Sequence, residues 1–165
     1  MAFVNRRTEL KTLESWWQKP YPRPALIWGR RRVGKTSLVQ EFAKGRRAIF
    51  HLGLGRTESG ELAQLSLKVV AARLGGARDL TSRPYSSWEE ALDHLASLAR
   101  EEPLLLVLDE FPEMVTKSPE LPGILRAFLD LSREQTQLRI LLCGSAVRTM
   151  QAIGEHRAPL YGRFD

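Results

Sequence analysis

The sequence predicts a three-layer α/β fold with a mostly parallel sheet in one domain of 165 residues. Short apolar runs, typical of buried strands, alternate along the chain with segments whose apolar residues recur at helical spacing. Such alternation is typical of parallel sheets with right-handed crossovers. The composition, 43% hydrophobic and 27% charged, suits a globular domain with a substantial core.

The first 24 residues are expected to form an N-terminal segment attached to a core over residues 25–165. A helix is predicted over 9–17, where leucine and tryptophan recur at helical spacing. A proline-rich linker follows, because alternate prolines at 20–24 hold the backbone extended. The core then opens with a buried strand over 25–28.

The rest of the core continues the alternation of helices and strands. The expected elements are, in chain order, a helix over 35–44, a strand over 47–52, a helix carrying Leu62, Leu65, Val69 and Ala72, a helix opened by a capping box at 87–90, a strand over 104–108, a helix carrying Ile124, Leu125, Phe128 and Leu131, a strand over 138–143 and a helix over 147–153. In such sheets, ligands bind at the carboxyl ends of the strands.

Composition excludes several classes of protein. A single cysteine, Cys143, rules out an internal disulfide and a multi-cysteine zinc site, and its place in a strand predicts a buried side chain. The three histidines have no metal-ligand spacing. No apolar run is long enough to cross a bilayer, and the N-terminus has no secretory signal, so we expect a cytoplasmic protein without a membrane partner.

Charge is distributed unevenly around the net value of +6. Residues 1–56 hold thirteen Lys or Arg against three Asp or Glu, whereas residues 57–165 hold twelve against sixteen. A basic half suits nucleic acid or another anionic ligand, but it also suits solvated helix faces, which composition alone favours.

The strongest chemical signal follows the first strand. Its residues match the Walker A pattern G-x-x-x-x-G-K-[ST]: Gly29, Arg30, Arg31, Arg32, Val33, Gly34, Lys35 and Thr36. The glycines let backbone N–H groups approach phosphate without a Cβ clash. Lys35 would contact the β- and γ-phosphates, Thr36 would ligate Mg²⁺, and Ser37 would complete the nucleotide-binding segment.

Two acids end the apolar strand over 104–108, which is a Walker B pattern. Asp109 would orient Mg²⁺, and Glu110 would polarise the water that attacks the γ-phosphate. Alone, these acids are equally compatible with an exposed turn; the Walker A loop favours the catalytic interpretation. An adjacent glutamate resembles the additional-strand, catalytic-glutamate division of P-loop ATPases. The absence of an Asn-Lys-x-Asp motif from the sequence favours ATP over GTP.

A small polar residue, Ser145, follows the strand over 138–143. In the same division a polar side chain here, called sensor 1, lies near the γ-phosphate and the attacking water. Ser145 would also serve as the N-cap of the helix expected over 147–153, and the two roles are compatible.

Five segments together resemble the archaeal-type ATPase family of the AAA+/STAND group, in order over nearly the whole chain. They are residues 3–10, 29–38, 104–112, 143–145 and 159–163. The resemblance implies that Arg6 lies near the adenine, although Asn5 stands where the family has glycine. It also implies that Arg163 acts on the γ-phosphate, in cis or across a subunit boundary, unless it is a surface residue.

The family's members are longer than this chain, adding a further strand, a helical lid and effector domains after the motif that contains Arg163. We therefore expect an ATPase core that lacks its last strand, with the strand over 25–28 at an open edge suited to self-association.

The resulting expectation is Mg²⁺-dependent ATP hydrolysis coupled to a conformational switch, carried by Lys35, Thr36, Asp109, Glu110 and Ser145. The alternative is a nucleotide-gated regulatory or DNA-associated module with little hydrolysis of its own. Arg30, Arg31 and Arg32 would contact phosphate, a partner subunit or DNA, and at least one of them is expected to face solvent.

Overall fold

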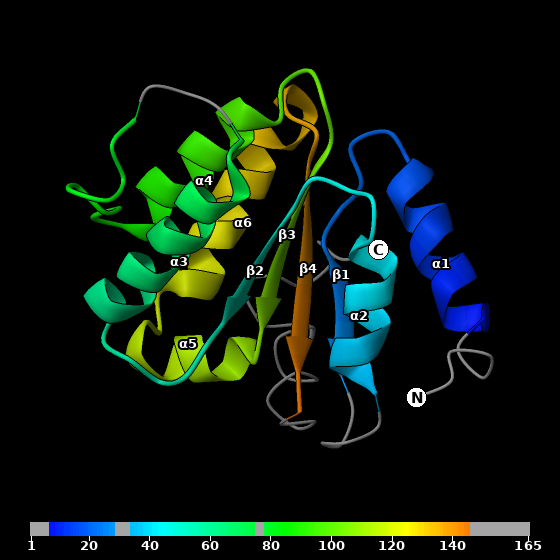
Figure 1. Cartoon of the computed structure of the whole chain (residues 1–165), viewed down its shortest axis with the longest axis horizontal. Coiled ribbons are helices and arrows are strands. Elements are labelled where there is room, and N and C mark those ends of the chain that lie inside the picture. Colours follow the sequence, from blue (N-terminus) through cyan, green and yellow to red (C-terminus); the bar gives the residue numbers. More distant parts are fainter. Residues whose placement is uncertain (1–6, 29–33, 75–77, 146–165) are drawn as a thin grey trace.

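A four-stranded parallel sheet forms the centre of the molecule (Figure 1). The computed structural model describes residues 7–28, 34–74 and 78–145. The strands are β1 (Ala25–Trp28), β2 (Ala48–Leu52), β3 (Leu104–Asp109) and β4 (Leu138–Gly144), in the spatial order β1-β4-β3-β2. All three strand pairings are parallel, which confirms the predicted fold class.

The helices run mostly between consecutive strands. They are α1 (Arg7–Gln18), α2 (Lys35–Ala43), α3 (Glu58–Ala72), α4 (Trp88–Leu98), α5 (Phe111–Lys117) and α6 (Leu121–Ser132), with a 3₁₀ turn at Arg133–Gln135 before β4. None of the helices in the described residues is both long and apolar enough to cross a membrane.

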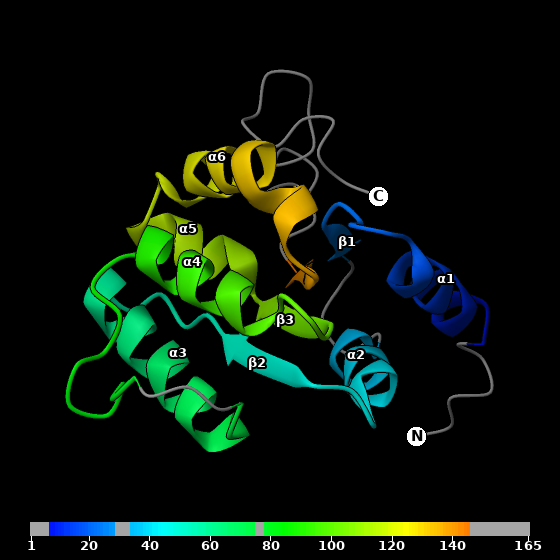
Figure 2. The same ribbon diagram turned by 90° about the horizontal axis from the view of Figure 1, so that it is seen from above.

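The helices cover both faces of the sheet and so produce three layers (Figure 2). Side chains of β3 alternate between the two faces. Leu104, Leu106 and Leu108 pack into the larger core, beneath α3 to α6. Leu105 and Val107 pack into a second core, beneath α1 and α2. Because β3 is covered on both faces, its five leucine and valine side chains are all buried, as its apolar run predicts.

Local side-chain bonds fix where two helices begin. The Thr57 hydroxyl accepts from the backbone N–H of Gly60 at the start of α3. The Ser87 hydroxyl accepts from the N–H of Glu90 at the start of α4, as the capping box predicts. The Glu90 carboxylate, however, accepts from the backbone N–H of Ser86 (2.7 Å) rather than that of Ser87.

The helix predictions from α5 onward have different outcomes. The predicted helix that carries Leu125 and Phe128 is α6, which buries these two residues with Leu121 but leaves Leu131 75% exposed. Helix α5 was not predicted from the sequence and has only seven residues. The helix expected over 147–153 lies outside the described residues.

Candidate functional site

The start of α2 carries the described part of the Walker A loop. Gly34 is its N-cap residue and has φ 87°, in the left-handed region where glycine is favoured. Its carbonyl accepts from the N–H of Leu38 (2.9 Å), so the helix begins directly after the turn. Lys35 is the first residue of α2, and Thr36 and the half-buried Ser37 follow in the first turn.

Thr36 meets Asp109 across the sheet edge. The Thr36 hydroxyl donates to Asp109 Oδ2 over 3.3 Å, although 73 residues separate them in the sequence. Thr36 is exposed and Asp109 is half-buried. The pair therefore presents oxygen atoms toward solvent, and oxygen atoms are the ligands that Mg²⁺ prefers.

Glu110 reverses the chain directly after β3. Its backbone lies in the left-handed region (φ 52°, ψ 46°), which costs a residue with a side chain about 1–2 kcal/mol. Its N–H donates to Asp109 Oδ1 (2.9 Å), and its Oε2 accepts from the Ser145 hydroxyl (3.0 Å). The chain reversal thus places the carboxylate against the residue that follows β4.

Sheet register explains why these four side chains, which we call the strand-end site (Thr36, Asp109, Glu110 and Ser145), lie together. Leu108 pairs with Leu142, and Trp28 pairs with Gly144, so β1, β4 and β3 end at the same edge. The sequence prediction that the motifs meet at the carboxyl ends of the strands agrees with this register.

Other predicted site residues lie outside the described part of the chain. They are Arg6, Gly29, Arg30, Arg31, Arg32, Val33 and Arg163. Cys143, by contrast, is described and buried in β4, as expected for a packing residue.

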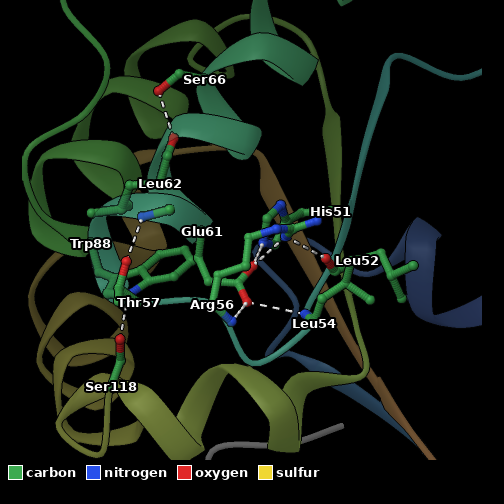
Figure 3. Close-up of polar contacts among 11 residues, drawn as sticks. His51, Leu52, Leu54, Arg56, Thr57, Glu61, Leu62, Ser66, Trp88 and Ser118 are labelled. Atoms are coloured by element: carbon green, nitrogen blue, oxygen red, sulfur yellow. Dashed lines mark hydrogen bonds and ion pairs between the residues drawn. The ribbon is translucent and has the colours of Figure 1, made fainter.

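A buried polar cluster next to the strand-end site was not predicted from the sequence. It comprises His51 of β2, Glu61 of α3 and Arg56 of the loop between them (Figure 3). His51 and Glu61 are 1% and 0% exposed. The only sequence signal is alternation in β2, which places His51 on the same face as the core residue Ile49.

Burial and hydrogen bonding set the ionisation of this cluster. Burial lowers the pKa of His51, and its Glu61 neighbour offsets only part of that effect. Burial alone would raise the pKa of Glu61, but the backbone N–H groups of Leu54 and Arg56, together with His51, hold it below its usual value. Glu61 is therefore ionised at neutral pH and accepts from the Nε2–H of a neutral His51 (2.9 Å).

Comparisons with known proteins agree with this architecture. Residues 3–165 match the sequence profile of a family described as an ATPase domain predominantly from Archaea. An uncharacterized protein of Methanocaldococcus jannaschii, MJECL04, is 25% identical over 162 residues. A second protein of that organism, the uncharacterized ATP-binding protein MJ0423, is 42% identical over 47 residues, which are 28% of this chain and 80% of that protein.

Two solved structures share the fold. The Walker-type ATPase PABY2304 of Pyrococcus abyssi superposes with a TM-score of 0.75 at 21% identity, over 96% of this chain and 51% of its own. Cdc6p of Pyrobaculum aerophilum superposes with a TM-score of 0.56 at 17% identity, over 94% of this chain and 45% of its own. The alignment with MJECL04 covers 98% of this chain but only 34% of that protein. The chain therefore spans about a third to a half of the length of MJECL04, PABY2304 and Cdc6p.

Proposed function

The chain belongs to the family of ATPase domains predominantly from Archaea, and from that membership we propose that it binds ATP with Mg²⁺ and hydrolyses it at the strand-end site. The observation that carries the proposal is the meeting of Thr36 with Asp109 and of Glu110 with Ser145. The first contact brings together two oxygen atoms suited to a metal ion, and the second holds the carboxylate that would act on water.

The metal would be held by Thr36 and Asp109. Their oxygens converge from α2 and β3 at 3.3 Å, which suits a hard cation. No group of three or more His, Cys, Asp or Glu side chains is arranged to hold a metal in residues 7–28, 34–74 and 78–145. Mg²⁺ commonly uses one or two protein oxygens and completes its shell with phosphate and water, so the pair fits. When bound, Mg²⁺ would neutralise charge on the phosphates.

The chain's own groups would bind and orient the substrate. The Walker A backbone and Lys35 would hold the phosphates at the N-terminus of α2. Glu110 would accept a proton from the attacking water, because its carboxylate lies one residue beyond Asp109. Ser145 donates to Glu110 Oε2 and would fix the direction of that carboxylate. A conformational switch would follow if release of the γ-phosphate changes this contact.

Glu110→Gln tests the proposal most directly. The amide keeps the size of the side chain but cannot accept the proton of water, so we expect ATP affinity to be kept and turnover to fall about a hundredfold or more. Phosphate release measured beside binding of a fluorescent ADP separates the two properties. Turnover like that of the original chain would remove Glu110 from the mechanism.

The second candidate is a nucleotide-gated module with little hydrolysis. It needs only the phosphate-binding and metal-binding residues, Lys35, Thr36 and Asp109, and no action of Glu110 on water. Phosphate release with and without DNA distinguishes it from the first. ATP binding without turnover under both conditions would support it.

Self-association is proposed through β1. Within the described residues β1 is an edge strand that pairs only with β4, and an edge strand is where a strand of a second chain would add. Sedimentation velocity tests the proposal: a single monomeric species across a range of concentrations would contradict it.

A further inference from the structure

The loop between β2 and α3, residues 53–57, touches the backbone of both acids of the strand-end site. The Gly53 N–H donates to the Asp109 carbonyl over 2.8 Å. A Cβ at Gly53 would lie 2.8 Å from the Glu110 carbonyl oxygen and 2.7 Å from Met114 Cγ. Only glycine fits this approach, so the position of the loop and the position of the Glu110 backbone depend on each other.

The Glu61 carboxylate determines where that loop lies. It is fully buried and accepts four hydrogen bonds (Figure 3). Two come from loop backbone, the N–H groups of Leu54 and Arg56, each at 3.0 Å. The other two come from side chains, Arg56 Nη1 and His51 Nε2, each at 2.9 Å.

The surroundings of this carboxylate point to a role in holding structure. A buried charge is stable only where nearby donors satisfy it. Here the donors are one residue (Leu54) and three residues (Arg56) beyond Gly53, so the carboxylate fixes the segment that lies next to the Glu110 carbonyl. His51 is itself held against the ring of Trp88, with ring centroids 6.2 Å apart.

We propose that Glu61, with His51, is a positioning residue for Glu110. It orders the loop over 53–57 so that Gly53 bonds to the Asp109 carbonyl and lies close to the Glu110 carbonyl, and thereby keeps Glu110 in its left-handed conformation facing Ser145. The catalytic part of this inference rests on the proposed hydrolysis of ATP; the structural link between Glu61 and the Glu110 backbone does not.

Glu61→Gln is the first test. The amide places an N–H₂ group where donors already converge, so at least one of the four bonds is lost. We expect kcat to fall about tenfold while affinity for fluorescent ADP with Mg²⁺ changes less than about threefold. Glu58→Gln is the matched control, because it makes the same change in the first turn of α3 outside the cluster. Unchanged kcat in Glu61→Gln would overturn the proposal.

Two substitutions at His51 separate the hydrogen bond from packing. His51→Gln retains an N–H in place of Nε2–H and is expected to keep kcat within about twofold, whereas His51→Leu removes the donor and is expected to lower kcat in the same direction as Glu61→Gln. Equal kcat in the two variants would contradict a positioning role for the bond.

Amide hydrogen exchange provides a measurement that does not need turnover. In the original chain the Gly53 N–H is bonded to Asp109, so we expect protection there that falls about tenfold or more in Glu61→Gln but not in Glu58→Gln. If the original chain shows no phosphate release, the proposed hydrolysis fails while this experiment still tests the link. Unaltered Gly53 exchange would overturn the link itself.

Gly53→Ala keeps the test decisive should Glu61→Gln fail to fold. It leaves the Glu61 side chain unchanged and displaces the Glu110 carbonyl or the Met114 side chain that its Cβ would meet, so we expect lower kcat with retained nucleotide affinity. Gly123→Ala in α6 is the control, because a Cβ there meets nothing within 4 Å. Equal kcat in both alanine variants would contradict the proposal.

Discussion

Two sets of acidic side chains lie close together at the carboxyl edge of the sheet, and they differ in how many protein groups donate hydrogen bonds to their carboxylates. Glu61 is 0% exposed and its carboxylate accepts four protein hydrogen bonds. Asp109 and Glu110 are half-buried, and each carboxylate accepts one side-chain hydroxyl bond, with one further bond from the Glu110 N–H to Asp109. Protein donors therefore saturate the first carboxylate, whereas the other two keep capacity for a ligand.

This difference predicts which acid supports folding and which acts on substrate. Removal of a saturated buried acid leaves several donors without partners, so the main loss is stability. Removal of a partly solvated acid leaves water to replace its bonds, so the main loss is ligand binding or turnover.

The largest effect is expected from Glu61→Ala. It leaves two backbone N–H groups, His51 and Arg56 without their acceptor, and we expect the free energy of unfolding to fall by about 3 kcal/mol or more. Urea unfolding followed by tryptophan fluorescence measures it. Glu58→Ala, on the same helix, is expected to change stability far less. Equal losses in the two variants would mean that saturation of the carboxylate has no special role.

Asp109→Asn is expected to show the opposite pattern. The amide keeps the Thr36 contact possible but removes the negative charge, so Mg²⁺-dependent nucleotide binding should weaken about 10- to 100-fold. Because the group is partly solvated, the midpoint of urea unfolding should stay close to that of the original chain. Titration of fluorescent ADP at several Mg²⁺ concentrations gives the affinity. A large stability loss with unchanged binding would reverse the assignment of the two carboxylates.

Ser145→Ala is expected to have a smaller effect, confined to turnover. It removes the hydroxyl that donates to Glu110 Oε2 at 3.0 Å, and a hydrogen bond to a charged group is worth about 1.5–3 kcal/mol. If the bond orients Glu110 for catalysis, kcat should fall about tenfold while nucleotide affinity is kept. A rise in kcat would instead indicate that Ser145 restrains the carboxylate.

The contrast also shows which features the sequence is able to predict. The strand over 25–28 and the meeting of Thr36, Asp109 and Ser145 follow from apolar runs and from parallel strands ending at one edge. The Glu61 cluster does not follow, because an acid on a helix is ordinarily expected to face solvent. Two of its four donors are backbone groups, which every residue type carries and no pattern of side chains reveals.

Two helices near the site also have features that the sequence pattern does not predict. Helix α5 has only seven residues, too few for a helical pattern to be recognised in the sequence. Its N-cap is Glu110, whose backbone lies in the left-handed region. In α6, Leu131 has the spacing of a core residue but is exposed, because the tertiary arrangement selects Leu121, Leu125 and Phe128 for burial. Packing between elements, rather than periodicity within one, decides both cases.

The smallest predicted effect is a change in the pH dependence of stability that isolates the buried cluster. Because burial lowers the pKa of His51 in the folded state, the unfolded chain binds more protons as pH falls through the usual histidine value of 6.5. Stability is therefore full above that value and decreases below it. Glu61 acts in the same direction at lower pH: its lowered pKa gives stability that is present above its usual value of 4.5 and is lost as pH falls further.

His51→Gln should flatten this dependence between about pH 7 and 5.5, because Gln keeps an N–H donor to Glu61 and does not titrate. The difference from the original chain corresponds to at most one proton, or about a tenfold change in the folding equilibrium per pH unit. His94→Gln is the comparison: burial also lowers the pKa of His94, which is paired with the Tyr85 hydroxyl away from this cluster, so its substitution should remove a separate contribution of the same sign. Urea unfolding at each pH gives the slopes. If His51→Gln has the slope of the original chain while His94→Gln does not, His51 is not the buried neutral donor that holds Glu61.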